Sequence, residues 1–182
     1  FDKLSELDST QNLKFAEWYY GPQKRIMASS ILNLSQSNIF DKGRFIVSYQ
    51  AIGESRHNRK FGSEILYNQN ERLDVYSING DFSKNMYEKL EMLYGFEYTN
   101  NLLFSDSNSA IIDTSNPSVF LSEDQSFSRY PNDKATHSAL AGYFKYLKKI
   151  NNYSNLNFGL RLSHNKVTVG WDFDSEEFLN DD

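Results

Sequence analysis

Apolar and polar residues alternate with a period of two along much of the chain. In the stretch 88–98 every second residue from Leu90 to Tyr98 is apolar or aromatic, and the positions between them are mostly charged or small. Such alternation is typical of β-strands with one apolar and one polar face. Five other stretches alternate in the same way, although 138–148 is less regular. The pattern predicts six strands, over residues 24–36, 43–52, 72–82, 88–98, 138–148 and 155–164.

The predicted strands and links have the dimensions of a membrane barrel. Strands of about ten residues exceed the usual five or six and match the roughly 9 to 11 with which a tilted strand crosses a bilayer. Short links alternate with long ones, as in outer-membrane barrels, whose periplasmic turns are short and extracellular loops long. A loop as long as 99–137 is uncommon in compact soluble domains. The short predicted links are residues 37–42, 83–87 and 149–154, and the long ones are residues 53–71 and 99–137.

We therefore expect an all-β fold, namely a segment of an antiparallel transmembrane β-barrel. The smallest natural membrane barrels have about eight strands, and strand edges must be paired in lipid, so six strands would belong to a larger barrel. The first residue, Phe1, and the acidic end at Asp182 agree with a fragment of a longer protein. The alternative is a soluble β-sandwich, for example a carbohydrate-binding module, because period two alone does not say whether the apolar phase faces lipid or a second sheet.

Composition and charge narrow the function classes. With 24 acidic and 19 basic residues the net charge is −5, which argues against nucleic-acid binding through a general cationic surface. The lack of cysteine excludes disulfides, thiolate nucleophiles and cysteine metal sites. No apolar run approaches the roughly 18 residues of a membrane helix. The 14 Phe and 12 Tyr residues could supply the aromatic girdles of a barrel, although both residue types are favoured in strands of any kind.

Four segments carry a resemblance to a known family. They are residues 16–25 (AEWYYGPQKR), 40–62 (FDKGRFIVSYQAIGESRHNRKFG), 72–82 (RLDVYSINGDF) and 128–133 (SRYPND). With the strands that they join, these segments cover most of the chain, and the match is more specific from Phe15 to Phe82 than afterwards. In these segments the chain resembles the barrel domain of TonB-dependent outer-membrane receptors, particularly those of Bacteroidetes.

The resemblance implies a specific architecture and activity. It implies a barrel of roughly 22 strands around an N-terminal plug, with residues 1–182 forming part of the barrel, and the plug and the other strands outside this sequence. The receptor would take up a scarce nutrient, such as a ferric siderophore, cobalamin, haem or an oligosaccharide, through the outer membrane of a Gram-negative bacterium. Its expected partners are the inner-membrane TonB–ExbB–ExbD complex, contacted through the plug, the small nutrient ligand, and outer-membrane lipid and lipopolysaccharide.

Candidate ligand-binding residues lie where predicted strands run into long loops. The aromatic residues Trp18, Tyr19 and Tyr20 could form a ledge on which a flat ligand stacks, or could anchor the strand end at the membrane interface. The cationic residues that follow a later strand could attract a siderophore carboxylate or a phosphate; alternatively they form a salt-bridged loop or contact lipopolysaccharide. These cationic residues are Arg56, His57 and Arg59, and the SRYPND motif adds Arg129 and Tyr130.

Metal binding and catalysis have little support in the sequence. The three histidines are far apart, and none has a carboxylate at metal-ligand spacing. The acidic stretch 172–182 lacks the glycine and closing glutamate of an EF-hand loop, so a solvated loop is favoured over calcium binding. No nucleophile elbow, HExxH motif or P-loop occurs, and Ser55 near His57 is too ordinary a pair to indicate a hydrolase. We expect no metal, no cofactor and no enzymatic activity.

Overall fold

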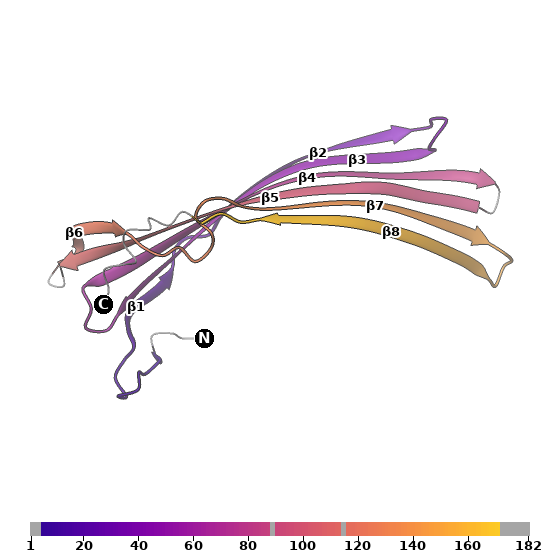
Figure 1. Ribbon diagram of the computed structural model, residues 1–182. Coiled ribbons are helices and arrows are strands. Elements are labelled where there is room, and N and C mark those ends of the chain that lie inside the picture. The colour runs from indigo at the N-terminus through magenta and orange to yellow at the C-terminus, as the bar shows by residue number, and fades with distance from the viewer. Residues whose placement is uncertain (1–4, 88–89, 114–115, 172–182) are drawn as a thin grey trace.

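The computed structural model describes residues 5–87, 90–113 and 116–171, and the acidic stretch 172–182 lies outside them. These residues form eight strands of one antiparallel sheet (Figure 1). Among the described residues there is no helix long and apolar enough to cross a membrane. The strands are β1 (Phe15–Tyr20), β2 (Lys24–Ser35), β3 (Lys42–Lys60), β4 (Ile65–Tyr87), β5 (Leu90–Asp113), β6 (Asn116–Gln125), β7 (Ala135–Lys149) and β8 (Asn155–Thr168).

The three longest strands, β3, β4 and β5, form the centre of the sheet, which runs in the order β1-β3-β4-β5-β7-β8. Strands β1 and β2 pair with the same edge of β3, one after the other, and residues 21–23 separate them. In the same way β6 and β7 both pair with β5, and the segment 126–134 separates them. The sheet is therefore six strands wide, and within the described residues it is open, with β2 and β8 at its edges.

The prediction of an all-β, antiparallel fold is confirmed, and each of the six predicted strands overlaps one of β2, β3, β4, β5, β7 and β8. The long predicted loops are wrong. Strands β3 and β4 continue through most of 53–71 and are joined by a short turn, in which Gly62 has a φ of +76°. Strand β5 continues to Asp113 and is followed by β6. The two phases are alike in these segments, so no alternation is visible in the sequence, but the backbone ladder does not require one apolar face.

The pairing register places the apolar phase of every predicted strand on the same face of the sheet. Residues directly opposed in an antiparallel pair project to the same side. Val47 lies opposite Ser30 and Ile78, Ile78 opposite Tyr98, and Tyr98 opposite Leu140. This side of the sheet is the apolar face, and its members include Ile26, Leu32, Phe45, Val47, Ile78, Phe82, Met92, Phe96, Leu140, Phe144, Leu156, Phe158, Leu160 and Leu162.

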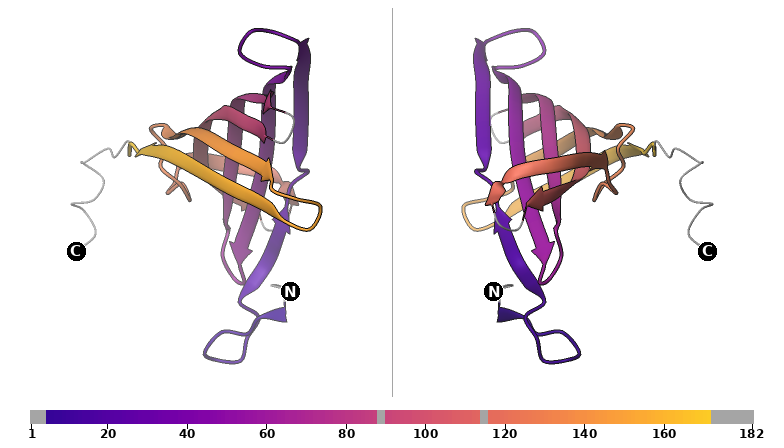
Figure 2. Two further views of the ribbon diagram at one scale, coloured as in Figure 1. Left: turned by 90° about the vertical axis from the view of Figure 1, so that its right-hand side faces the viewer. Right: turned by 90° about the vertical axis from the view of Figure 1, so that its left-hand side faces the viewer.

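Within the residues that the structure describes, no second layer covers the apolar face. Among the described residues only Leu66, Ala110, Ile112 and Ala141 are buried hydrophobic residues. By contrast, Phe96 on the central strand β5 is 39% exposed, although it has paired strands on both sides. Figure 2 shows the sheet as a single twisted layer, with β7 and β8 running obliquely to β2 and β3. The sheet is thus held by its backbone ladder and cross-strand pairs rather than by a hydrophobic core.

The opposite side, the polar face, is tied together by side-chain hydrogen bonds between neighbouring strands. The hydroxyls of Ser48 and Ser77 lie 2.6 Å apart. The guanidinium of Arg161 on β8 contacts the carboxylate of Glu97 on β5 at 2.8 Å, across the intervening strand β7. The sheet therefore has a mainly apolar and a mainly polar surface. An exception on the apolar side is Asp74, which forms an ion pair with Arg72 and accepts a hydrogen bond from Tyr49.

Aromatic rings lie over glycines at three points of the sheet. On the apolar face Phe82 lies against Gly43, and Phe96 lies against Gly80, where an added Cβ would come within 2.5 Å of the ring. On the polar face the ring of Tyr143 crosses Gly95 and its hydroxyl donates a hydrogen bond to Asp81. Glycine leaves room for a neighbouring ring to cover the backbone, an arrangement that also pins the strand register.

Replacing Gly95 by alanine should destabilise the sheet. The new Cβ would overlap the carbonyl oxygen of Gly80 and the phenol of Tyr143, and such overpacking costs about 1–3 kcal/mol. Gly159→Ala is the matched control, because its Cβ would meet its nearest neighbour at 3.5 Å. Urea denaturation of both variants measures the free energy of unfolding. Equal stability of the two variants would contradict the close contact at Gly95.

Candidate functional site

The central strands continue well beyond the apolar face, and we call this part the extension. It comprises residues 54–60 of β3, 65–71 of β4 and 104–113 of β5, with β1 and β6 at its edges. At the left of Figure 1 it carries the turn between β3 and β4. All eight candidate ligand-binding residues lie in β1, in the β3 part of the extension or in the segment 126–134.

The structure brings the two motif-rich segments together, which the sequence did not predict. Strand β1 pairs with the end of β3, so that Tyr20 lies opposite Arg56, and Tyr19 opposite His57. Because side chains alternate along a strand, the three aromatic residues 18–20 do not form one ledge. Tyr19 projects to the side that continues the apolar face, whereas Trp18 and Tyr20 project to the polar face.

On the polar face Arg56 is the centre of the contacts. Its guanidinium lies 5.1 Å from the centroid of the Tyr20 ring, and Trp18 meets Tyr20 edge to face with centroids 4.9 Å apart. Arg56 also forms an ion pair with Glu54 at 3.2 Å. The aromatic and cationic candidates on this side are therefore one contiguous group.

On the other side of the extension His57 and Arg59 are also partnered. The ring of Tyr19 stacks on His57 with centroids 4.6 Å apart. His57 Nδ1 lies 2.6 Å from Asn68 Oδ1, and its Nε2 lies 3.0 Å from Ser55 Oγ. Arg59 forms an ion pair with Glu17 of β1 at 2.7 Å. Arg56 and Arg59 are thus both in ion pairs, as in the salt-bridged alternative left open by the sequence, although on strands rather than in a loop.

Arg129 and Tyr130 lie on the same face as the Arg56 group, over β5. The guanidinium of Arg129 is 5.3 Å from the ring centroid of Tyr130. The backbone N–H of Tyr130 donates to Ser105 Oγ at 3.4 Å, and Ser105 lies opposite Glu71 in the ladder. The segment that separates β6 from β7 therefore folds back onto the polar face beside Glu71.

Glu71 is the buried charge of this region. It is 6% exposed, and among the described residues neither of its carboxylate oxygens has a hydrogen-bond partner. Burial raises the pKa of Glu71 above its usual range; nearby Arg56 opposes this shift, and Glu54 adds to it. With Glu54, Arg56 and Glu71 together, the polar face of the extension carries more negative than positive charge at this point.

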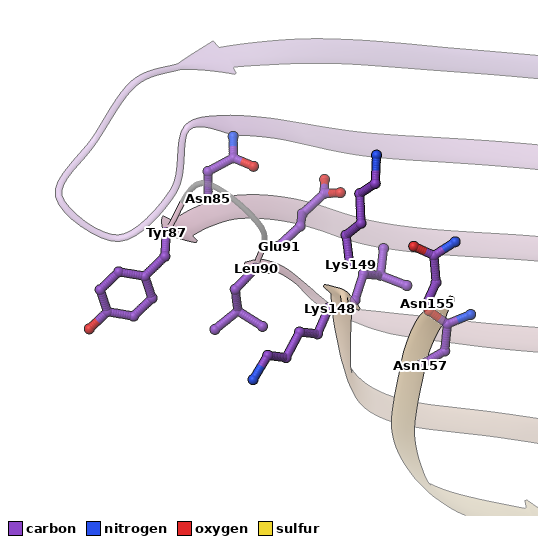
Figure 3. A pocket seen from close by; sticks show the side chains of 9 residues that line it. Asn85, Tyr87, Leu90, Glu91, Lys148, Lys149, Asn155 and Asn157 are labelled. Carbon is purple, nitrogen blue, oxygen red and sulfur yellow. The ribbon is translucent and has the colours of Figure 1, made fainter. Parts of the chain in front are cut away.

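A separate hollow lies at the opposite end of the sheet, where the short turns gather (Figure 3). Its volume is about 400 Å³. Figure 3 shows Leu90 and Lys148 pointing to one side of the sheet, and Glu91 and Lys149 to the other. The hollow therefore wraps round the end of the sheet. Its nine lining residues are Asn85, Tyr87, Leu90, Glu91, Leu147, Lys148, Lys149, Asn155 and Asn157.

Sequence reasoning did not single out Glu71 or Asn68. Both lie in the segment that we predicted to be a loop, and the residues around them come close only through the pairing of β4 with β3 and β5. The one available signal was Gly62, since a glycine between two polar stretches of similar length is typical of a hairpin turn.

Comparisons with protein-family models, curated protein sequences and solved structures gave no match. In the part of the chain that the structure describes, no group of three or more His, Asp or Glu side chains is placed to hold a metal ion.

Glu71→Gln should stabilise the protein at neutral pH. Because its pKa is raised by folding from 4.5, the folded state binds more protons than the unfolded state above that pH, and the free energy of unfolding falls as pH rises through the folded pKa. Gln has no charge to bury, so the free energy of unfolding of the variant does not fall with pH in this way. We expect it to exceed that of the wild type by on the order of 1 kcal/mol at pH 7, and to equal it below about pH 4. Denaturation curves from pH 3.5 to 8 measure it.

Glu64→Gln is the control, because Glu64 is an exposed side chain in the turn between β3 and β4. We expect this substitution to change the free energy of unfolding by no more than about 0.5 kcal/mol at every pH. A Glu71 variant that is less stable than the wild type at pH 7 would show that its carboxylate has favourable partners.

Proposed function

We propose that this chain forms part of the wall of an outer-membrane β-barrel, with its apolar face toward lipid and its polar face toward the lumen. We further propose that the barrel is a TonB-dependent receptor that takes up a scarce nutrient. The observation that carries the proposal is the continuous apolar face, which six strands build in register and which no second layer covers within the described residues.

The size of the apolar face suits a bilayer. On β5 the apolar phase runs over the nine residues from Leu90 to Tyr98. This length is within the roughly 9 to 11 residues with which a tilted strand crosses a bilayer. The apolar segments are staggered between strands, from residues 26–34 on β2 to residues 156–162 on β8. Stagger of this kind accompanies the tilt of barrel strands.

The edges of the sheet also fit a wall segment. In hydrocarbon an unpaired backbone N–H or C=O costs several kcal/mol, so strands cross a membrane only in closed barrels. The outer edges of β2 and β8 have no paired strand among the described residues. Under the proposal, further strands of the same barrel pair with both edges.

A soluble β-sandwich, the alternative from the sequence, would require a second sheet about 10 Å from the first to bury the apolar face. The described residues form one sheet and leave Val47 43% and Leu160 56% exposed. Exposed apolar surface of this extent promotes aggregation in water. This counts in favour of the barrel.

The receptor role rests on the family resemblance and on the position of the candidate residues. Beyond the apolar face, the extension would stand on the extracellular side, where a nutrient arrives. On its polar face Trp18, Tyr20 and Arg56 lie on β1 and β3, and the segment with Arg129 and Tyr130 contacts Ser105 on β5, so that Glu71 of β4 lies between the two groups. These five residues on one face are the proposed ligand contacts. Tyr19, His57 and Arg59 project to the outer side. Energy would come from the TonB–ExbB–ExbD complex through the plug.

Neighbouring residues on opposite faces provide the test, and the chain has no native cysteine to interfere. Val47→Cys and Ser48→Cys form one pair, and Leu160→Cys and Arg161→Cys another. After reconstitution in lipid vesicles, an environment-sensitive fluorophore at Val47 and Leu160 should emit at shorter wavelength and be quenched by brominated lipid. At Ser48 and Arg161 it should do neither. Brominated-lipid quenching therefore reads out which face meets lipid.

Two outcomes would overturn the membrane proposal. One is equal quenching at both members of each pair. The other is a chain that is monomeric and unfolds cooperatively in buffer without detergent, as the sandwich alternative requires.

A further inference from the structure

Ser55, His57 and Asn68 form a hydrogen-bonded relay on the outer side of the extension. His57 Nδ1 lies 2.6 Å from Asn68 Oδ1, and His57 Nε2 lies 3.0 Å from Ser55 Oγ. An amide oxygen can only accept a hydrogen bond, so the contact with Asn68 Oδ1 selects the His57 tautomer with its proton on Nδ1. Its Nε2 is then free to accept the hydroxyl proton of Ser55. This is the order of contacts in a nucleophile, a general base and an orienting group.

From this geometry we propose that Ser55, His57 and Asn68 are the catalytic machinery of a serine hydrolase that cleaves the acyl ester of a membrane amphiphile. Ser55 and His57 are the catalytic residues. Asn68 is a positioning residue that acts through His57, as an asparagine does in cysteine–histidine–asparagine sites. This activity would be additional to the proposed uptake of a nutrient.

Gly21 and Asn70 are the neighbours of the relay that bear on the approach of a substrate. Gly21 lies directly over Ser55, and an added Cβ there would overlap the Ser55 hydroxyl and come within 3.4 Å of His57 Nε2. A side chain at residue 21 would therefore collide with the Ser55 hydroxyl, which the glycine avoids. Asn70 lies opposite Ser55 in the ladder and is exposed. Directly opposed Cβ atoms are about 4.5–5.5 Å apart, so the Asn70 amide is placed to donate to an oxyanion, as side-chain amides do in other hydrolases.

The position of the relay selects the substrate class, and this step rests on the proposed function. Ser55 and His57 share their side of the sheet with the apolar face. Ser55 lies four residues beyond Ala51, the residue of the apolar phase on β3 that pairs with Ile26 at the end of the apolar segment of β2. Four residues correspond to about 13 Å along the strand, and to less in height because barrel strands are tilted. Ser55 therefore lies on the headgroup side of the apolar face, toward which the ester groups of membrane amphiphiles are placed.

The reaction balances with water as the second reactant. Ser55 Oγ adds to the ester carbonyl carbon while its proton passes to His57 Nε2. The bond to the alcohol oxygen then breaks, and the alcohol leaves with that proton. Water attacks the acyl–Ser55 ester, giving a proton to Nε2, and the carboxylic acid departs as the proton returns to Oγ. No electron transfer is involved.

The test uses the full chain in detergent micelles, with a fluorophosphonate probe and p-nitrophenyl octanoate. The wild type should be labelled at Ser55, located by peptide mass spectrometry, and should hydrolyse the ester. Ser55→Ala should lose both, whereas Ser77→Ala, which removes a hydroxyl from the polar face, should keep both. Absence of labelling and hydrolysis in the wild type, or full hydrolysis by Ser55→Ala, would overturn the proposal.

The positioning role of Asn68 is tested by a measurement that would not change if Asn68 only stabilised the fold. Asn68→Leu should lower kcat by about 10²-fold or more with little change in KM, and Asn68→Asp, which restores an acceptor for Nδ1, should recover most of kcat. A uniform loss in both variants would overturn the positioning role.

Vesicles of phosphatidylethanolamine and of lipopolysaccharide then identify the source of the ester. Release of fatty acid from one kind of vesicle identifies its lipid as the substrate, whereas no release from either kind would overturn the lipid assignment. The fluorophore at Val47→Cys reports lipid contact independently of hydrolysis. A failure of this proposal is therefore distinguishable from a failure of the barrel.

Discussion

The register of the β3–β4–β5 ladder is the constraint on which the rest of the structure depends. Each pairing opposes residues of the same phase, so Val47, Ile78 and Tyr98 fall on one side of the sheet. A slip of one residue in any strand would move its apolar set to the polar face. Glycines crossed by aromatic rings, as at Gly80 and Gly95, oppose such a slip by steric fit.

Because the ladder gathers apolar side chains on one side without covering them, their burial must come from outside the described sheet. In water such a surface and the open edges of β2 and β8 favour association with other chains. In a bilayer the same surface meets lipid, and only the edges need partners. The polar face, with the contact between Arg161 and Glu97, suits a hydrated lumen.

The same alternation governs the extension, where polar and apolar residues occur on both faces and function is proposed. It divides residues 18–20 between the two sides and pairs Arg56 with Glu54, and Arg59 with Glu17. It also sets His57 opposite Asn68 in the ladder. One hairpin thus supplies two different surfaces: an aromatic and charged group facing the proposed lumen, and a hydroxyl–imidazole–amide relay facing outward.

The sequence by itself determined the all-β class, the six alternating strands and their apolar phase. The reason is that apolar residues such as Phe45 and polar residues such as Arg44 alternate with the two-residue period of a β-strand. It did not determine the course of 53–71 or 99–137, where the two phases are alike and period two leaves no trace. Only the tertiary structure decided that β1 pairs with β3 and that His57 meets Asn68. Such contacts depend on hydrogen bonds between distant backbone segments, and backbone groups are the same in every residue except proline.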